Sequence, residues 1–552
     1  MRAVLLALST ATCLLGAADP ISLPVPAPPA SLCQSRPAAA DAPAQALLPG
    51  YGTGGFAVRT TSPQAQAYFT NGMQLAHAFA HEPAIAAFRR AVQLDPACAM
   101  CVWGEAWSRG PTINYTIDAD KIAELAVLAD RAAALAVDGP PKERALVAAL
   151  QRRYHDGGGD GAGDLAFAEA MDALVRTAPD DDAIAIVAAD AWMIPASHHR
   201  DRQHLDRAVG LLAAVLARHP ADSGAIHFYI HATEMNGVGA DALPYVQRLQ
   251  ALAPAASHLV HMPSHTWFWT GHYREAKQAN VDAVAIDRAN TLAGKAADDV
   301  FELPYHGHNV HFGTAGALMD GDGAAALALA APVLERLPKI KEGEAWPQVV
   351  LGSAYFAYGR HADDAAIAAL PDPGEKLPLA RALWRYAHGE AAARRGDTKA
   401  LRGFAAEVAA DARRVDGLGR FQPKARALAE VARDVLRGRL AMLEGRAGDA
   451  IAFYRRAATL QDDELDGIAD PPIFWYPVRR SLAAALLSEG RTADAAREAK
   501  KVLVRWVGDP LSERILADVD AATGRPAEAQ RWLDGTRAHW NGDVAAVPLA
   551  LL

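Results

Sequence analysis

Histidines are concentrated in one part of the chain, and histidine is the commonest side-chain ligand of transition metals in proteins. The sequence contains 19 histidines, and nine of them lie between His227 and His311. Two imidazoles that stand four residues apart on one helix can bind the same metal ion. The concentration therefore predicts a functional cluster of histidines rather than scattered surface or core residues.

The spacing of these histidines indicates that they share one face of successive helices. In the segment 227–234 two histidines stand four residues apart, and a glutamate follows three residues later. In the segment 258–265 three histidines are separated by three and then four residues. Residues three or four apart lie on the same face of an α-helix. The candidate metal ligands are His227, His231, His258, His261, His265, His308 and His311, and Glu234 is the candidate acid–base or catalytic residue.

The offset between the two segments predicts how the cluster is divided. His227 and His261 are 34 residues apart, and so are His231 and His265. We therefore expect these four to form the inner pairs of two adjacent helices, with His258, His308 and His311 as the neighbouring half. Adjacent helices pack about 8–10 Å apart, so two neighbouring repeats can share an ion. Two ions, or one ion with an acid–base group beside it, fit this spacing better than one ion for all seven histidines.

The alternative is a groove that binds a peptide through hydrogen bonds and charge on the histidines. Seven protonated histidines on one face would repel each other, and a metal removes that repulsion because it binds neutral imidazole. Imidazole ligands suit copper, zinc or iron, and the shortage of carboxylates disfavours calcium and magnesium. We therefore favour a transition metal.

The elements that must position these side chains are helix pairs that recur along the chain. At several places a glycine is followed four residues later by an acidic residue and then alanine, and weaker copies occur near Gly359 and Gly396. Glycine permits the tight turn that ends the first helix, and alanine lets the second helix pack closely on the first. One pair cannot bury its apolar face alone, so pairs stack on one another. The clear copies begin at Gly237, Gly271, Gly445, Gly490 and Gly524.

The interval from Gly237 to Gly271, like that from Gly490 to Gly524, is 34 residues, and this period resembles the tetratricopeptide repeat. The resemblance covers about residues 63 to 540. It implies an all-α solenoid of helical hairpins, a right-handed superhelix, whose first helices line a concave groove that binds ligands. The inner positions after about residue 345 lack the histidine pattern, so we expect that half to brace the array or to bind a protein partner. The expected divisions are a signal peptide (1–18), a Pro/Ala-rich linker or arm (19–62), an N-terminal array with the histidines (63–340) and a C-terminal array (341–552).

Several motifs resemble a bacterial family of exported tetratricopeptide proteins. They are His227-Phe-Tyr-Ile-His231-Ala-Thr-Glu234, His258-Leu-Val-His261-Met-Pro-Ser-His265 and His308-Asn309-Val-His311-Phe312. Two more are Phe79-Ala-His81-Glu82-Pro-Ala84 and Trp103-Gly104, which leads to Gly110-Pro111 and Asn114. The chain departs from the family at Ala80, where related sequences usually carry Asn. The resemblance implies that these positions form a site, and it does not specify a reaction.

The N-terminus is typical of a secretory signal peptide. Arg2 precedes an apolar run from Val4 to Leu15, which is too short to span a bilayer, and small residues at 16–18 permit cleavage. We therefore expect a periplasmic or secreted protein with no membrane span after the signal is removed. The net charge is −9 and the basic residues are scattered, which argues against a nucleic-acid partner.

Three cysteines would remain after cleavage: Cys33, Cys98 and Cys101. An odd number excludes complete pairing within one monomer. The Cys98-x-x-Cys101 spacing is compatible with a redox or metal pair, or with two small core residues on a helix, and we favour the core residues.

These patterns together predict an exported, all-helical protein that binds a transition metal. We expect a metal-dependent enzyme, an oxidoreductase or a hydrolase, that acts on a small molecule or peptide in the concave groove. The alternative is a non-catalytic scaffold that binds a peptide or protein partner or carries metal.

Overall fold

The fold is described from a computed structural model, in which residues 46–156, 161–199, 203–292, 299–465 and 470–552 are described. The expected signal peptide and Cys33 lie outside these residues. The described residues form α-helices with a few short 3-10 and π turns, and they contain no β-strand, which confirms the all-α class.

The described residues from 46 to Trp269 form thirteen α-helices, joined mostly by short turns. Their bounds are α1 (Pro63–His77), α2 (His81–Leu94), α3 (Ala99–Ser108), α4 (Ala119–Ala136), α5 (Pro141–His155), α6 (Ala162–Thr177), α7 (Asp182–His199), α8 (Leu205–Arg218), α9 (Ser223–Met235), α10 (Leu243–Val246), α11 (Leu249–Leu252), α12 (Ser257–His261) and α13 (Pro263–Trp269).

The remaining helices continue the same arrangement of successive antiparallel pairs. Their bounds are α14 (Tyr273–Leu292), α15 (His306–Asp320), α16 (Gly323–Leu334), α17 (Ala345–His361), α18 (Asp364–Ala368), α19 (Pro378–Arg394), α20 (Thr398–Ala412), α21 (Gln422–Leu443), α22 (Ala447–Leu460), α23 (Arg479–Ser488), α24 (Thr492–Arg505), α25 (Pro510–Ala522) and α26 (Pro526–His539). Among the described residues, no helix combines the length and the apolar character that crossing a membrane requires.

Local sequence explains where the helices around the histidines begin and end. The Asp222 carboxylate accepts a hydrogen bond from the N–H of Ala225 and so caps the start of α9. Pro263 is the first residue of α13, a position where its missing N–H costs no helical hydrogen bond. Gly321 ends α15 with a φ of 75°, a left-handed conformation that glycine adopts at little cost.

The five clear repeat glycines all adopt positive φ and end a helix, as expected. Gly359 is different, because α17 continues past it to His361. A Cβ at Gly359 would lie only 2.8 Å from the Cα of Ala387, so this glycine permits close packing of helices. The weak repeat that we expected to turn at Gly359 therefore turns later, after His361.

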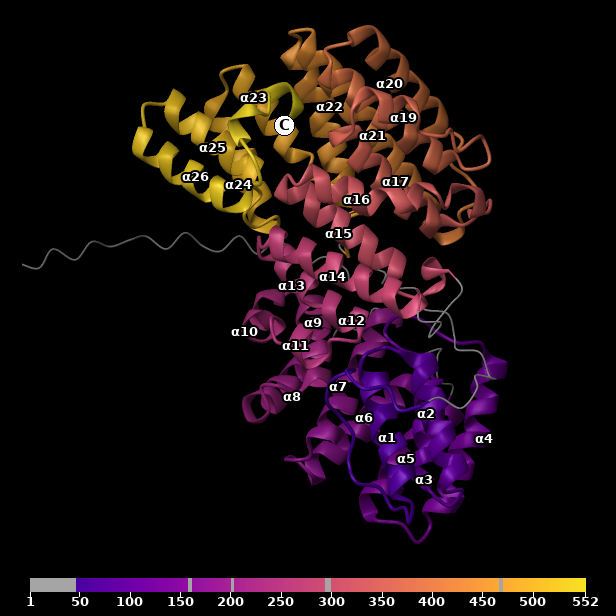
Figure 1. Ribbon diagram of the computed structural model, residues 1–552. Helices are drawn as coiled ribbons and strands as arrows, with labels where there is room; N and C mark the ends of the chain where they lie inside the picture. The colour runs from indigo at the N-terminus through magenta and orange to yellow at the C-terminus, as the bar shows by residue number, and fades with distance from the viewer. Residues whose placement is uncertain (1–45, 157–160, 200–202, 293–298, 466–469) are drawn as a thin grey trace, which may run out of the picture.

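The array runs from one end of the molecule to the other and then bends back on itself (Figure 1). Helices α1–α8 form one end, α9–α14 the middle, and α15–α22 the opposite end, from which α23–α26 turn aside. The Tyr273 hydroxyl donates a hydrogen bond of 2.9 Å to the carbonyl of Val507, which lies between α24 and α25. The N–H of Asn541 donates one of 2.6 Å to the carbonyl of Asp320. The last hairpins thus pack against α14 and α15.

The apolar core is divided into two parts that meet at the histidine-rich segment. One part runs from Ala65 to Met262 and includes Tyr305. The other begins at Phe268 and continues to Leu552 without a break near residue 340. The histidines from His258 to His265 lie where the two parts meet, so a polar layer separates them. The boundary that we expected after residue 340 stays a prediction.

Candidate metal centre

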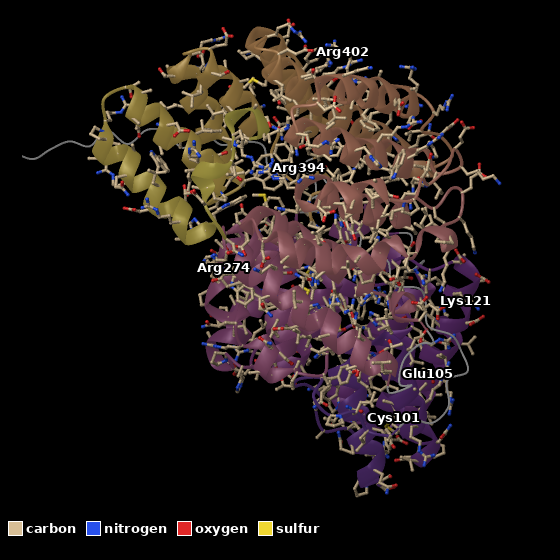
Figure 2. The ribbon with its side chains drawn as sticks, turned by 45° about the horizontal axis from the view of Figure 1, so that its top comes forward. Cys101, Glu105, Lys121, Arg274, Arg394 and Arg402 are labelled. Atoms are coloured by element: carbon tan, nitrogen blue, oxygen red, sulfur yellow. A yellow bond between two sulfur atoms is a disulfide. The ribbon has the colours of Figure 1, made fainter. Side chains whose placement is uncertain are left out.

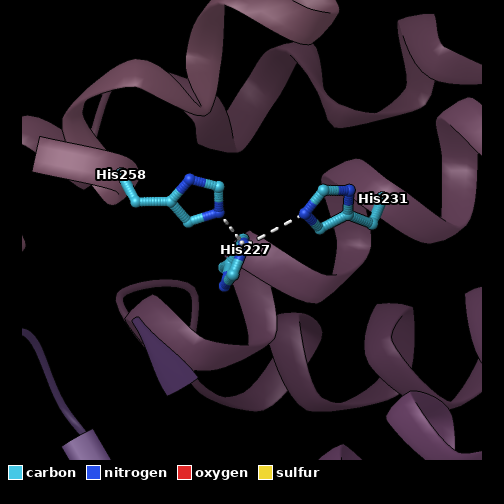
Figure 3. Close-up of side chains that lie close together, drawn as sticks. All are labelled: His227, His231 and His258. Carbon is cyan, nitrogen blue, oxygen red and sulfur yellow. Dashed lines mark hydrogen bonds between the residues drawn. The ribbon is translucent and has the colours of Figure 1, made fainter. Parts of the chain in front are cut away.

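Three histidines converge on one point in the middle of the array, and we call them triad A (His227, His231 and His258). His227 and His231 come from successive turns of α9, and His258 comes from α12. The Nε2 atom of His227 lies 3.1 Å from that of His231 and 3.2 Å from that of His258 (Figure 3). These ring nitrogens lie within 4.8 Å of one another, which is close enough to share one metal ion.

Three further histidines form a second convergent group, triad B (His261, His265 and His308). The Nε2 atom of His261 lies 2.9 Å from that of His265 and 3.1 Å from that of His308. A helix boundary falls between His261 and His265, because α12 ends at His261 and α13 begins at Pro263. Met262 between them keeps helical angles, with φ −51° and ψ −37°, so the two histidines still face each other.

The structure brings together six of the seven histidines, but in a different grouping from the one that we expected. His258 joins the α9 pair, and His308 joins the pair at the α12–α13 junction. The triads are neighbours, because the rings of His231 and His265 and those of His258 and His261 are each 5.7 Å apart. His311 is in neither triad, and its ring lies 5.5 Å from that of Trp346.

Hydrogen bonds on the outer ring nitrogens fix the tautomer of two of the six rings. The Nδ1–H of His227 donates to the carbonyl of His77 at 2.6 Å. The Nδ1–H of His261 donates to the side-chain oxygen of Asn280, also at 2.6 Å. Because a neutral imidazole carries one proton, each of these Nε2 atoms presents a lone pair to its triad. Such outer partners are typical of histidines that bind metal.

Glu234 lies beside triad B and contacts the outer ring nitrogen of one of its histidines. Its carboxylate accepts a hydrogen bond of 2.9 Å from the Nδ1 of His265, whose Nε2 faces His261. In this position Glu234 orients His265, and one of its oxygens remains without a protein hydrogen-bond partner.

Two residues of the centre, Asp470 and Asn280, escaped the sequence analysis. Asp470, which lies in the segment between α22 and α23, places an oxygen 3.2 Å from the Nδ1 of His265 and 3.6 Å from the Nε2 of His308. Neither it nor Asn280 is part of a histidine motif, and the folding of the chain brings Asp470 to the site across 205 residues. A polar residue on the second helix of a histidine-bearing repeat was the only signal for Asn280.

Burial keeps most of the candidate histidines neutral. Desolvation lowers the pKa of six of the seven, to about 3 for His227 and for His311. His265 is the exception: burial opposes its protonation, but the carboxylates of Asp470 and Glu234 raise its pKa to about 9. Burial raises the pKa of Asp470 to about 7. Six of the seven histidines are thus neutral nitrogen donors, whereas two carboxylates favour the protonated form of His265.

The candidate site is not the open groove that we expected. All seven histidines have exposed fractions between 0% and 6%. The Phe79 ring packs 4.5 Å from that of His227, the Tyr305 ring 4.2 Å from that of His258, and the Phe312 ring 4.9 Å from that of His265. The C-terminal half folds back onto the middle of the array and places Asp470 beside His265 and His308. The groove at this position is therefore filled by the protein's own side chains.

The two cysteines of the Cys98-x-x-Cys101 motif are buried at the start of α3 and form a disulfide with each other (Figure 2). Both have an exposed fraction of 0%, which confirms that they are core residues. No candidate metal group among the described residues includes them.

No family model matches the chain, and no curated protein matches it. Among solved structures, it is similar to the human IFIT1 dimer with PPP-AAAA, at 13% identity over 83% of this chain and 94% of that chain, with a TM-score of 0.33. The APC/C hetero-tetramer Cut9-Hcn1 is similar at 12% identity over 88% and 74%, with a TM-score of 0.30. The TPR domain of P58(IPK) is similar at 13% identity over 61% and 89%, with a TM-score of 0.20. Scores this low carry no conclusion about function, and the fold rests on the helix packing described above.

Proposed function

We propose that this chain is a histidine-liganded metalloprotein that binds two neighbouring transition-metal ions, one in each triad. The observation that carries the proposal is the convergence of the ring nitrogens in each triad: the Nε2 of His227 or His261 lies 2.9 to 3.2 Å from the Nε2 atoms of its two partners, and all three ligand atoms lie within 4.8 Å. Nitrogens that bind one ion at about 2.0–2.1 Å are separated by about 2.9–3.4 Å for bond angles near 90–109°. The four separations that involve His227 and His261 fall in this range.

Hydrogen bonding within the protein satisfies these nitrogens less well than an ion does. In triad A the Nε2 of His227 has a lone pair, because its Nδ1 proton is donated to the carbonyl of His77. Both His231 and His258 would then have to donate to that one lone pair, and a lone pair accepts one N–H well. A cation instead accepts all three lone pairs.

The ligand set favours copper, zinc or iron. All six convergent atoms are imidazole nitrogens, and imidazole suits these metals, whereas calcium and magnesium prefer oxygen ligands. The two carboxylates, Glu234 and Asp470, contact the outer nitrogen of His265. Carboxylates in this outer position orient a histidine and make it a stronger metal ligand.

We further propose that the protein is exported and that the centre is catalytic. The N-terminal signal pattern and the Cys98–Cys101 disulfide support export, since disulfides persist mainly in oxidising compartments. A pair of adjacent metal ions supports catalysis, because two ions can stabilise both reacting groups of one substrate. Burial of the histidines argues against the alternative, a peptide held in the groove above them.

Elemental analysis of protein purified from its native compartment tests the metal proposal. We expect about two transition-metal ions per chain. His231→Ala removes a ligand from triad A and His265→Ala removes one from triad B, so each variant is expected to lose about one ion. Alanine is a better helix former than histidine, so the helices are retained.

His219→Ala is the matched control. The side chain of His219 is 65% exposed, pairs with Asp182 and belongs to neither triad. This variant is expected to keep its metal. Full metal occupancy in both His231→Ala and His265→Ala would refute the proposal.

A further inference from the structure

A small cavity lies beside triad A, between the first hairpins and α9. Polar side chains from three helices and a loop line it: His81, Ser108, Thr112 and Asp190. The rings of Phe79 and Phe228 form an apolar wall. The cavity has room for about one or two water-sized groups.

Two of the polar side chains that line this cavity, His81 and Ser108, lack hydrogen-bond partners within the protein. Neither ring nitrogen of His81 has a hydrogen-bond partner, and neither does the hydroxyl of Ser108. Their exposed fractions are 9% and 4%, and that of Asp190 is 6%. An unpaired buried polar group costs about 1–3 kcal/mol, so proteins rarely leave several around one space. A polar molecule bound in the cavity would satisfy them together.

Phe79 separates the cavity from triad A. Its ring stacks 5.3 Å from that of His81 on one side and packs 4.5 Å from that of His227 on the other. Its φ is +54°, and it is the one residue other than glycine with positive φ in the described residues. Glycine is usual at such a turn, and strained residues of this kind concentrate at functional sites. The unfavourable backbone conformation at Phe79 thus accompanies the placement of its ring between His81 and His227.

We propose that the cavity binds a small uncharged molecule that both donates and accepts hydrogen bonds, of the size of water or hydrogen peroxide, and passes it to triad A. The inference rests on the metal centre proposed above and names its class of substrate. Imidazole and hydroxyl groups can each donate or accept, and Asp190 offers an acceptor, so the lining matches such a molecule. The six histidines of the two triads are at most 6% exposed, so a larger substrate has no direct approach to them.

Cobalt-loaded protein tests this proposal, because ligand binding changes the visible absorption of Co²⁺. The probe is hydroxylamine, which is small, donates and accepts hydrogen bonds, and binds metals. O-benzylhydroxylamine carries the same group on a bulky ring and serves as the size control. We expect hydroxylamine to change the spectrum and O-benzylhydroxylamine to leave it unchanged.

Two substitutions at Ser108 change the cavity in opposite directions. Ser108→Leu fills it and is expected to slow the response to hydroxylamine by about tenfold or more, whereas Ser108→Ala enlarges it, removes only the hydroxyl and is expected to slow the response less than Ser108→Leu does. Ala76→Val, which also fills the cavity, replaces Ser108→Leu if that variant does not fold. Phe79→Gly suits the positive φ and removes the ring, so the response should become faster.

The outcomes separate this inference from the metal proposal. If the protein binds no cobalt in triad A, the metal proposal itself fails. If cobalt binds but the filled variants respond as fast as the wild type, or O-benzylhydroxylamine binds as fast as hydroxylamine, the cavity is not the route and only this inference is overturned.

Discussion

At the scale of single residues, the outer hydrogen bonds of the histidines determine which nitrogen faces the centre. Asn280 accepts from the Nδ1 of His261 and also donates to the carbonyl of Ala276, so its amide is held in one orientation. That orientation leaves the Nε2 of His261 as the common neighbour of His265 and His308. The Asn280 amide thus orients the Nε2 of His261 for metal binding and is not itself a ligand.

Asn280→Leu should therefore weaken metal binding at triad B by about 10- to 100-fold, which is the usual effect of losing an outer partner. Competition with a chromophoric chelator measures the affinity of each site. Asn280→Asp retains an acceptor for His261 and is expected to bind nearly as well as the wild type. Unchanged affinity in a folded Asn280→Leu protein would contradict this role.

The neutral histidines also predict how pH affects the metal-free protein. Burial lowers the pKa of His227 from 6.5 to about 3. Between these values the unfolded chain takes up a proton and the folded chain does not, so stability falls as the pH drops below 6.5. The loss is about 1 kcal/mol per such histidine between roughly pH 7 and pH 5.5. His265 has the opposite sign, because its pKa is raised to about 9 and its contribution is lost as the pH rises through that value.

Urea unfolding of metal-free protein at the two pH values measures this effect. His227→Gln removes one titrating group and should show a smaller decrease in the free energy of unfolding on acidification. An equal decrease in the variant and the wild type would mean that His227 does not titrate as described.

At the scale of elements, the turn glycines end the helices, but their surroundings differ. Gly321 and Gly490 both have positive φ, 75° and 69°. A Cβ at Gly321 would lie 2.6 Å from the ring of Trp540, whereas at Gly490 no atom lies within 4 Å. The turn after α15 is thus covered by the C-terminal segment, while the turn after α23 is open.

Gly490→Ala should destabilise the protein by about 1 kcal/mol, from the backbone conformation alone. Gly321→Ala carries the same backbone cost and also displaces Trp540, so a total of about 2–4 kcal/mol is expected. Chemical denaturation of the metal-free variants gives both values. Equal destabilisation would show that Trp540 does not pack on this turn.

At the scale of the whole molecule, the C-terminal half folds back on the histidine-rich segment and contributes a residue to the candidate metal centre. Asp470 contacts His265 and His308 of triad B. All six convergent nitrogens come from residues 227 to 308. The C-terminal half is therefore expected to tune one of the two ions rather than to hold it.

Asp470→Asn should lower the metal affinity of triad B by about tenfold and leave that of triad A unchanged. A two-site metal titration distinguishes the sites, and Asp463→Asn, at an exposed position, is the control. Loss of both ions from a folded Asp470→Asn protein would contradict this division of roles.

The sequence alone determined the helical fold and the identity of most of the centre. The Gly-x-x-x-acid-Ala pattern predicted the hairpins because turn geometry and close helix packing are local requirements, and the i, i+4 spacing placed His227 with His231 for the same reason. Gly359 shows the limit of this logic, since a glycine needed for close packing has the same appearance in a sequence as one needed for a turn.

Only the tertiary structure decided how the histidines are grouped and what surrounds them. His258 joins triad A, and His311 joins neither triad, because the angle between packed helices is set by side chains from several elements at once. Asp470 reaches the centre because the array bends back on itself. Phe79 reaches it because its turn adopts a positive φ. These contacts join residues separated by up to 205 positions, so no local pattern records them, and they convert an expected open groove into a buried centre.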